Sequence, residues 1–259
     1  MAKKKLTERS AITLQDIGID LYRPVKIVLI GCGGTGSLLL SALARLNDMM
    51  IRMSIGSLFV SVVDDDIFEE HNVCKQTCSP SDMGRHKAEV CVERINEFYG
   101  FSWAYSISRY PVINGDTMQK YDICISAVDN VQTRMMLFQK IRYPIIDIGN
   151  GQDYGQIILS YNSISLSQIF LPSTEDLFQI SKKPVDNTVS CSMAESLEQQ
   201  SLFVNSMAAL LAANMLSDLF VNRYLEYTQI YFSLNPLNVK SKIEIYENLN
   251  RKKQAKKHD

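Results

Sequence analysis

The stretch VKIVLIGCGGTGS, residues 25–37, places an unbroken apolar run directly before a turn that holds four glycines within six positions. Val25, Ile27, Val28, Leu29 and Ile30 are mostly β-branched and form a run too short for a helix, which is typical of a central parallel strand. A helix is expected to begin near Thr35. In the pattern G-x-G-x-x-G, absent side chains permit a tight turn and let backbone N–H groups approach phosphate oxygens at a helix N-terminus. The glycines that fit this pattern are Gly31, Gly33 and Gly36. The stretch predicts a bound nucleotide, although glycines in such turns can also serve packing alone.

The bulk composition is that of a globular α/β protein with reduced thiols. The chain has 259 residues, of which 46% are hydrophobic, and a formal net charge of -1, which argues against a generally polyanion-binding surface. Lysines cluster at the two ends, as MAKKK and RKKQAKKHD, and are interpreted as solvated tails. Six cysteines without a secretory leader or a regular spacing predict a cytoplasmic protein. We expect no nucleic-acid partner and no membrane.

Two further features restrict the class of protein. The most apolar helix-like stretch, from Phe203 to Phe220, is interrupted by Asn205, Asn214 and Asp218, so it is expected to be a core helix and not a membrane span. The sequence contains no C-x-x-C pair and only three histidines, which gives a structural zinc site little support.

Strand-like and helix-like segments alternate along the chain. After the glycine turn, we expect a helix over 37–45, a long connection NDMMIRMSIGSL, a strand over 59–63, a helix over 82–99 with Val90, Ile95 and Phe98 on its apolar face, and strands over 121–128 and 143–149. Antiparallel strands over 152–171, a loop over 172–190 and a helix that closes the fold are expected to follow. The predicted fold class is α/β: a doubly wound, mostly parallel Rossmann-like sheet with an antiparallel C-terminal extension.

Ligands of such a sheet lie beyond the carboxyl ends of its strands, where the glycine turn, the acids after the second strand and the pair Asp129 and Asn130 are all expected. Asp64 ends the second strand, where a carboxylate can accept hydrogen bonds from ribose hydroxyls. Its distance from Gly36 is 28 residues, whereas dehydrogenases that bind NAD have roughly 20. The spacing therefore weakens the interpretation as an NAD-dependent oxidoreductase.

Other side chains near the predicted strand ends suit a polyphosphate. Lys75 and Lys87 can neutralise the negative charge that grows as pyrophosphate departs. Asp129 can hold Mg²⁺, a hard cation that proteins bind through one or two carboxylates and phosphate oxygens. Asn72 can donate to a phosphate oxygen. Each residue alone could be a surface charge or a loop cap, so the prediction depends on their joint placement.

The order of these motifs resembles the ThiF/MoeB branch of the ubiquitin-activating-enzyme superfamily over roughly residues 25–220. The family pattern G-x-G-G-x-G, D-x-D-x-x-x-x-x-N-x-x-R-Q, G-x-x-K and D-N-x-x-x-R is met by GCGGTG, by DDD with Asn72, Lys75 and Gln76, by GRHK and by DNVQTR. A later stretch, SCSMAESLEQQSLFVNS, looks most like the ThiF-type proteins of PRTRC cassettes. The predicted organisation is an N-terminal segment 1–20, partly flexible, a single adenylation domain 21–248 and a basic tail 249–259.

The resemblance implies ATP-dependent adenylation of the C-terminal carboxylate of a ubiquitin-like or sulfur-carrier protein, with Mg²⁺, by a homodimer. It implies that Gly34 and its neighbouring glycines line the phosphates, that Asp64 holds the ribose, and that Asp129 ligates Mg²⁺. It assigns Asn72, Lys75 and Lys87 to phosphate contacts. The remaining predicted wall residues are Asp66, His71, Gln76 and Asn130.

Cys191 aligns with the cysteine that forms a thioester or acyl persulfide with the activated carrier in some relatives. If the last helix begins just after it, the helix dipole favours the nucleophilic thiolate. The alternative is a small buried residue at the start of that helix. Cys32 and Cys124 are expected to be packing residues.

The sequence also departs from the family pattern. Lys75 stands where arginine is usual, which keeps the charge but loses the bidentate fork. The arginine that relatives contribute across a dimer has no clear counterpart in Arg9 or Arg23, and the paired zinc-binding C-x-x-C motifs are absent. A catalytically weak nucleotide-binding scaffold and an NAD-dependent oxidoreductase therefore remain alternatives to the adenylating enzyme.

Overall fold

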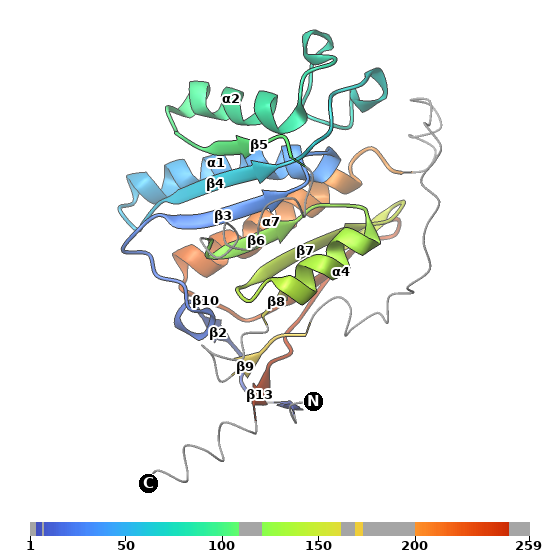
Figure 1. Ribbon diagram of the computed structural model, residues 1–259. Coiled ribbons are helices and arrows are strands. Elements are labelled where there is room, and N and C mark those ends of the chain that lie inside the picture. The colour runs from blue at the N-terminus through green and yellow to red at the C-terminus, as the bar shows by residue number, and fades with distance from the viewer. Residues whose placement is uncertain (1–3, 7, 109–120, 162–168, 173–199, 249–259) are drawn as a thin grey trace.

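The computed structural model describes residues 4–6, 8–108, 121–161, 169–172 and 200–248. Its centre is an eight-stranded sheet of order β12-β11-β8-β7-β6-β3-β4-β5 (Figure 1). Five neighbouring strands are parallel: β3 (Val25–Ile30), β4 (Leu58–Val63), β5 (Ala104–Ser106), β6 (Ile123–Ser126) and β7 (Ile145–Asn150). Three antiparallel strands follow β7 at one end: β8 (Tyr154–Ser160), β11 (Gln229–Leu234) and β12 (Leu237–Lys242). The predicted fold class is confirmed.

Helices cover both faces of this sheet. α1 (Gly34–Arg52), α2 (Lys87–Tyr99) and α7 (Val204–Val221) contribute buried side chains to one large apolar cluster, whereas α4 (Val131–Lys140) packs on the opposite face in a smaller one (Figure 1). From Ile27 onward β3 is apolar at every position: Ile27 and Leu29 belong to the large cluster, and Val28 and Ile30 belong to the smaller one. This part of the strand is buried on both faces and therefore needs apolar residues throughout, whereas Lys26 near its start is exposed.

Short elements complete the described chain. β1 (Lys4–Leu6), β13 (Tyr246–Asn248) and β9 (Ile169–Phe170) form a three-stranded sheet, and β2 (Ile12–Thr13) pairs with β10 (Tyr224–Leu225). Single 3₁₀ turns are η1 (Gln15–Ile17), η2 (Glu70–Asn72) and η3 (Pro80–Asp82). Ile12, Leu14, Ile17 and Ile19 are buried in the large cluster. The large cluster therefore includes part of the predicted N-terminal segment 1–20. The predicted tail 249–259 lies outside the described residues.

The predicted helix boundaries need correction in two places. α1 continues to Arg52, so most of the connection expected after residue 45 is helical, because Met50 extends the buried stripe of the helix and is fully buried. α2 begins at Lys87 and not at residue 82, because Gly84 has a left-handed φ of 81° between η3 and α2. Phe98, which the sequence placed on its apolar face, is 81% exposed.

α7 is a core helix, as predicted, but it does not close the fold, because β10 to β13 follow it. By length and composition alone α7 is also apolar enough to cross a membrane, with a mean hydropathy of 1.4. In this fold it packs along α1 and across β7 and β8 (Figure 1). Its first residues consequently lie beside the first residues of α1, at the carboxyl edge of the parallel strands.

Candidate functional site

A cavity of about 600 Å³ lies over the carboxyl ends of the parallel strands, where the strand order reverses between β3 and β6. Most of the predicted site residues line it: Gly31, Gly33, Gly34, Asp64, Asp66, His71, Asn72, Lys75, Gln76, Lys87, Asp129 and Asn130. Residues far apart in the sequence therefore meet around one space. Gly36 does not line the cavity, and Cys191 lies outside the described residues, so its predicted role stays a prediction.

The glycine turn is shaped by two close backbone approaches. Gly31 has a left-handed φ of 94°, and a Cβ there would lie 2.7 Å from the carbonyl oxygen of Ala127, which follows β6. A Cβ at Gly36 would lie 2.0 Å from the carbonyl oxygen of Gly31. Gly36 thus lets α1 pack against the turn, and its predicted contact with the nucleotide stays a prediction. Gly33 and Gly34 remain at the cavity surface.

The N-terminus of α1 lies at this cavity. α1 is 19 residues long, and its N-cap residue is Gly33, which has no side chain to cap the first turn. The first N–H groups of a helix have no partner within the helix, and its dipole places partial positive charge at the same end. The turn is therefore suited to phosphate oxygens.

Asp64 is held in a fixed orientation at the end of β4. Its two carboxylate oxygens accept from the backbone N–H groups of Cys32 and Asp66, the latter at 2.9 Å. Burial raises the pKa of the Asp64 carboxyl above its ordinary value, against the opposing effect of those two N–H groups. Each carboxylate oxygen can accept a second hydrogen bond. Asp64 can therefore receive two hydroxyl groups of a ligand without moving.

Lys87 places a cation at the edge of the cavity. Its Nζ donates to Oδ2 of Asp66 at 3.0 Å, and its backbone N–H donates to the carbonyl oxygen of Asp66 at 3.0 Å. The Lys87 side chain is only 9% exposed, whereas that of Asp66 is 67% exposed. The ammonium group is consequently held by the protein, and its countercharge on Asp66 is largely exposed.

The segment between β4 and α2 brings three more predicted residues to the cavity. Asn72 is buried, and its Oδ1 accepts from the N–H of Glu69 at 2.9 Å, which turns its amide nitrogen toward other partners. The carbonyl oxygen of Asn72 accepts from the N–H groups of Lys75 and Gln76. Oε1 of Gln76 is buried and has no hydrogen-bond partner within the described part of the chain. This segment therefore presents one cation and two amides to a ligand.

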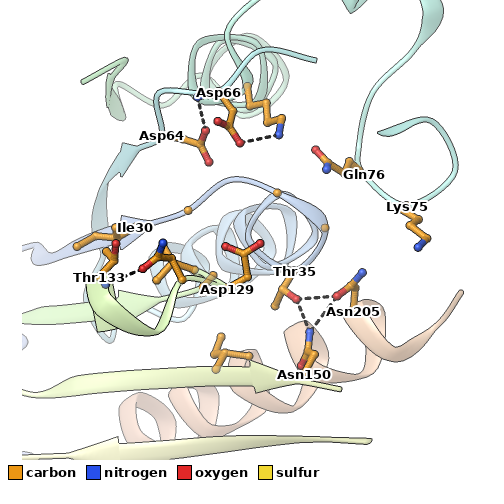
Figure 2. Close-up of a pocket in the computed structure, with 18 of the residues that line it drawn as sticks. Ile30, Thr35, Asp64, Asp66, Lys75, Gln76, Asp129, Thr133, Asn150 and Asn205 are labelled. Atoms are coloured by element: carbon orange, nitrogen blue, oxygen red, sulfur yellow. Dashed lines mark hydrogen bonds and ion pairs between the residues drawn. The ribbon is translucent and has the colours of Figure 1, made fainter. Parts of the chain in front are cut away.

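Asp129 and Asn130 follow β6 directly. Asn130 caps α4 by accepting from the N–H of Thr133 at 3.0 Å, whereas Asp129 is exposed and points into the cavity (Figure 2). No group of three or more His, Cys, Asp and Glu side chains comes together as a metal site in the described ranges. A single carboxylate fits Mg²⁺ only where phosphate oxygens and water supply the other ligands. Asp129 thus suits a metal ion that arrives with a nucleotide.

Sequence reasoning missed a group of neutral polar side chains opposite Asp64 and Lys87. Nδ2 of Asn150 donates to Oγ1 of Thr35 at 2.7 Å and to Oδ1 of Asn205 at 2.9 Å (Figure 2). Asn205 in turn donates from Nδ2 to Oε1 of Gln200 at 3.2 Å. We call Thr35, Asn150, Gln200 and Asn205 the amide wall. Its only sequence signals are an asparagine that ends a buried strand and another that interrupts an apolar helix.

A buried ion pair lies below the amide wall. Nε of Arg134 donates to Oδ1 of Asp147 at 3.0 Å, Nη2 of Arg134 donates to Oδ2, and Asp147 is fully buried. A Cβ at Gly149 would lie 3.0 Å from Nη2 of Arg134, so the glycine makes room for the guanidinium group. Asp147 is the one acid in the segment YPIIDIG, and the sequence analysis gave it no role. This pair fixes α4 against β7, and with it the position of Asp129.

Comparison with known proteins agrees with this geometry. A family model described as ThiF family matches residues 9–248. The ATP-dependent ubiquitin transferase-like protein Cap2 of Escherichia coli (strain TW11681) is 30% identical over 109 residues, which cover 39% of this chain and 17% of Cap2. MccB of E. coli, solved with ATP, has a TM-score of 0.58 and 17% identity over 88% of this chain and 65% of MccB. PaaA has a TM-score of 0.60 and 15% identity over 86% of this chain and 64% of PaaA.

The chain thus spans less than two thirds of the length of each of these proteins. The two solved structures share its fold. Their sequence identities of 17% and 15% to this chain show the fold alone. The family model, in contrast, spans the glycine turn, the cavity and the strands after α7. The chain belongs to the ThiF family.

Proposed function

We propose that the protein adenylates the C-terminal carboxylate of a ubiquitin-like or sulfur-carrier protein with ATP. The observation that carries this proposal is the convergence of the glycine turn, Asp64, Lys87 and Asp129 on one cavity. These groups match the three parts of a magnesium nucleotide: a ribose, a polyphosphate and a metal ion. Membership of the ThiF family supports the same assignment.

The nucleotide is placed by the groups on the β3 and β4 side of the cavity. The ribose hydroxyls donate to the oriented carboxylate of Asp64. The phosphates face the N-terminus of α1 and the amide of Asn72. Lys75 and Lys87 lie on the same side and offset the triphosphate charge. Bound Mg²⁺ would be held by Asp129 and would offset further charge on the phosphates.

The proposed step forms one bond and breaks one. A carboxylate oxygen of the carrier attacks the α-phosphorus, and the bond from that phosphorus to the oxygen that bridges toward the β-phosphate breaks. The products are an acyl-adenylate and pyrophosphate. A terminal carboxylate is already ionised at neutral pH, so the protein needs no general base. Lys87 contributes by stabilising the charge that moves onto the leaving pyrophosphate.

The partner is proposed to be a small protein with a C-terminal glycine. A solved structure supports a small partner, because MccB of E. coli was also solved with MccA. We propose a homodimer as well. Exposed apolar side chains at the start and on the outer side of α7 support it, since Phe203, the N-cap residue, is 66% exposed and Leu210 is 60% exposed. A cytoplasmic location, a PRTRC cassette and transfer of the carrier to Cys191 are proposed from the sequence alone.

Exchange of labelled pyrophosphate into ATP tests the proposal. The assay uses the full chain, Mg²⁺ and candidate carriers, namely small glycine-terminated proteins encoded beside this gene. Carrier-dependent exchange is expected, together with a reductant-sensitive conjugate that is lost in Cys191→Ser while exchange survives. ATP binding without exchange for any carrier would favour the nucleotide-binding scaffold, for which Lys75 and the missing N-terminal arginine are the motivating features.

A further inference from the structure

Within the described part of the chain, one histidine lines the cavity, and a short turn places it there. His71 is the middle residue of η2 and precedes Asn72, a buried residue that also lines the cavity. The N-cap residue of the turn is Glu69. Its carboxylate accepts from the backbone N–H of Asn72, and Oδ1 of Asn72 accepts from the N–H of Glu69 at 2.9 Å. These reciprocal bonds fix the turn and therefore the position of His71.

Glu69 also orients the imidazole ring of His71. Nδ1 of His71 lies 3.2 Å from Oε2 of Glu69. An ionised carboxylate only accepts hydrogen bonds, so the hydrogen of the neutral ring belongs on Nδ1 and leaves Nε2 as an acceptor. A second proton on Nε2 makes the ring a cation with two donors. Both side chains are partly exposed, so solvent can supply that proton.

His71 lies among charged groups from several elements. Glu69 and Glu70 belong to its own turn, Lys75 follows that turn, Asp64, Asp65 and Asp66 follow β4, Lys87 begins α2, and Asp129 precedes α4, which contains Arg134. Of the three cations that line the described cavity, Lys87 and Arg134 are each already paired with a carboxylate of the protein. A triphosphate brings several negative charges into this surrounding. A further cation in the wall would therefore strengthen its binding.

The segment that carries His71 lies at the phosphate end of the cavity. The carbonyl oxygen of Asn72 accepts from the N–H groups of Lys75 and Gln76, so these residues form one folded unit with the turn. A Cβ at Gly33, the N-cap residue of α1, would lie 4.0 Å from Nε2 of Gln76. Figure 2 shows Lys75 and Gln76 near the first turn of α1. Because phosphates are expected at that helix N-terminus, a charge on His71 acts mainly on the phosphates and not on the nucleoside.

We propose that His71 is a proton-dependent phosphate ligand: as an imidazolium held by Glu69, it donates from Nε2 to the terminal phosphates of ATP and to the pyrophosphate that leaves. The inference rests on the proposed function and adds a residue to it. One proton passes from solvent to Nε2, and no covalent bond of the nucleotide changes in this step. A hydrogen bond between ionised groups is roughly twice as strong as one between neutral groups. The phosphates are therefore bound more tightly on the acid side of neutrality than on the alkaline side.

Calorimetry with the full chain tests this role of His71. ATP with saturating Mg²⁺, pyrophosphate and AMP are each titrated at about pH 6 and about pH 8, on either side of the range in which histidine ordinarily titrates. The ligands titrate in this range as well. Burial raises the pKa of Asp64, so its protonation is also expected to weaken ATP binding at low pH. The quantity compared is therefore the ratio of the Kd of His71→Gln to the Kd of the wild-type protein at the same pH, in which both effects cancel.

The expected ratio depends on pH and on the ligand. For ATP and for pyrophosphate it should be near one at about pH 8 and about five to ten at about pH 6. For AMP, which lacks the terminal phosphates, it should stay near one throughout. A ratio for ATP that is the same at both pH values, or an equal change for AMP, would overturn the proposal while the nucleotide site stood. Absence of ATP binding by the wild-type protein at both pH values would instead contradict the proposed function.

A second pair of variants tests the part of Glu69. In Glu69→Gln the amide oxygen can still accept from the N–H of Asn72, so the turn is kept, but the charge beside Nδ1 of His71 is lost. The Kd for ATP relative to wild type should be near one at about pH 8 and at least about twofold higher at about pH 6. Glu70→Gln is the matched control, because Glu70 is an exposed acid of the same turn, and it should bind ATP as the wild type does at both pH values. Wild-type affinity of Glu69→Gln at both pH values would overturn the assigned pair, and this comparison decides the case if His71→Gln does not fold.

Discussion

The ammonium group of Lys87 lies 3.0 Å from a carboxylate oxygen of Asp66, and the lysine is the buried member of the pair. The cation of Lys87 is thus held inside the protein, and its countercharge on Asp66 lies at the surface. A triphosphate can approach the cavity without displacing Lys87, because the exposed Asp66 can turn to solvent. Neutralising Lys87 is therefore expected to impair the reaction with ATP, whereas neutralising Asp66 is not.

Neutralising Lys87 should abolish most of the activity and leave the fold intact. Lys87→Met keeps the apolar stem and removes the charge, so carrier-dependent pyrophosphate exchange is expected to fall by about 10²-fold or more. Arg85→Met is the matched control, since Arg85 is close in sequence but pairs with Glu93 at the surface. Exchange at the wild-type rate in Lys87→Met would remove this lysine from the proposed chemistry.

Neutralising Asp66 should have the reverse effect on nucleotide affinity. Asp66→Asn removes a negative charge beside the triphosphate, so calorimetry should show ATP binding as tight as in the wild type or a few times tighter. The protein without nucleotide should lose at most about 1 kcal/mol of unfolding free energy, because the carboxylate is largely exposed and screened. Weaker ATP binding in this variant would indicate that Asp66 contacts the nucleotide directly.

Alanine at three of the four glycines of the turn should separate packing from binding. Gly36→Ala is expected to cost about 3 kcal/mol or more of unfolding free energy, because its Cβ meets the backbone oxygen of Gly31. Gly34→Ala meets only the movable side chain of Asn205, so ATP affinity should fall more than stability. Gly33→Ala has room and is the folding control. Denaturant unfolding with and without ATP measures both effects, and a stable Gly36→Ala variant would contradict the packing role.

ATP affinity should fall on acidification at a higher pH than an ordinary aspartate would allow. Burial raises the pKa of Asp64, and the ribose hydroxyls need its ionised form as acceptor. Because the pKa of Asp64 is raised in the folded protein, the folded state binds this proton more tightly than the unfolded state does. Protonation of Asp64 therefore stabilises the folded protein without nucleotide, while it weakens the binding of ATP. Calorimetric titrations across mildly acidic pH measure the shift. An affinity that stays flat down to the ordinary pKa of aspartate would show that Asp64 does not hold the ribose.

A charge on the outer side of α7 should separate the proposed dimer. Leu210→Glu places a carboxylate at an exposed apolar position, so light scattering is expected to report a dimer for the wild type and a monomer for the variant. Leu237→Glu is the control, because Leu237 is 73% exposed on the edge strand β12, away from α7. A monomeric wild-type protein would end the dimer proposal without affecting the cavity.

The parts of the fold that depend on local patterns could be predicted from the sequence. β3 and the start of α1 follow from an apolar run and a glycine turn, and Asp64, Lys87 and Asp129 follow from motifs placed at strand ends. The end of α1 was missed because Asn47 and Asp48 look like a loop signal, although Asn47 is buried and accepts from the N–H of Leu58 at 2.7 Å. This hydrogen bond to the first residue of β4 compensates for the low helix propensity of Asn47 and Asp48.

The amide wall could not be predicted, because its members meet only through tertiary packing. Thr35, Asn150 and Asn205 come from α1, β7 and α7, and each reads as an ordinary polar residue in its own segment. The packing of α7 along α1 brings them together. The extension of β7 to Asn150, beyond its last pair with β6, could not be predicted either. Strand length and register depend on the neighbouring strands and not on the sequence of one strand alone.

Calorimetry with ATP and with NAD on the full chain, repeated on the double variant Asp64→Ala and Lys87→Met, tests the central claim most directly. We predict that the wild-type protein binds magnesium ATP, that NAD does not compete, and that the double variant, although folded, loses ATP binding. Tight binding of NAD without ATP, or an unchanged ATP affinity in the double variant, would contradict the assignment of this cavity.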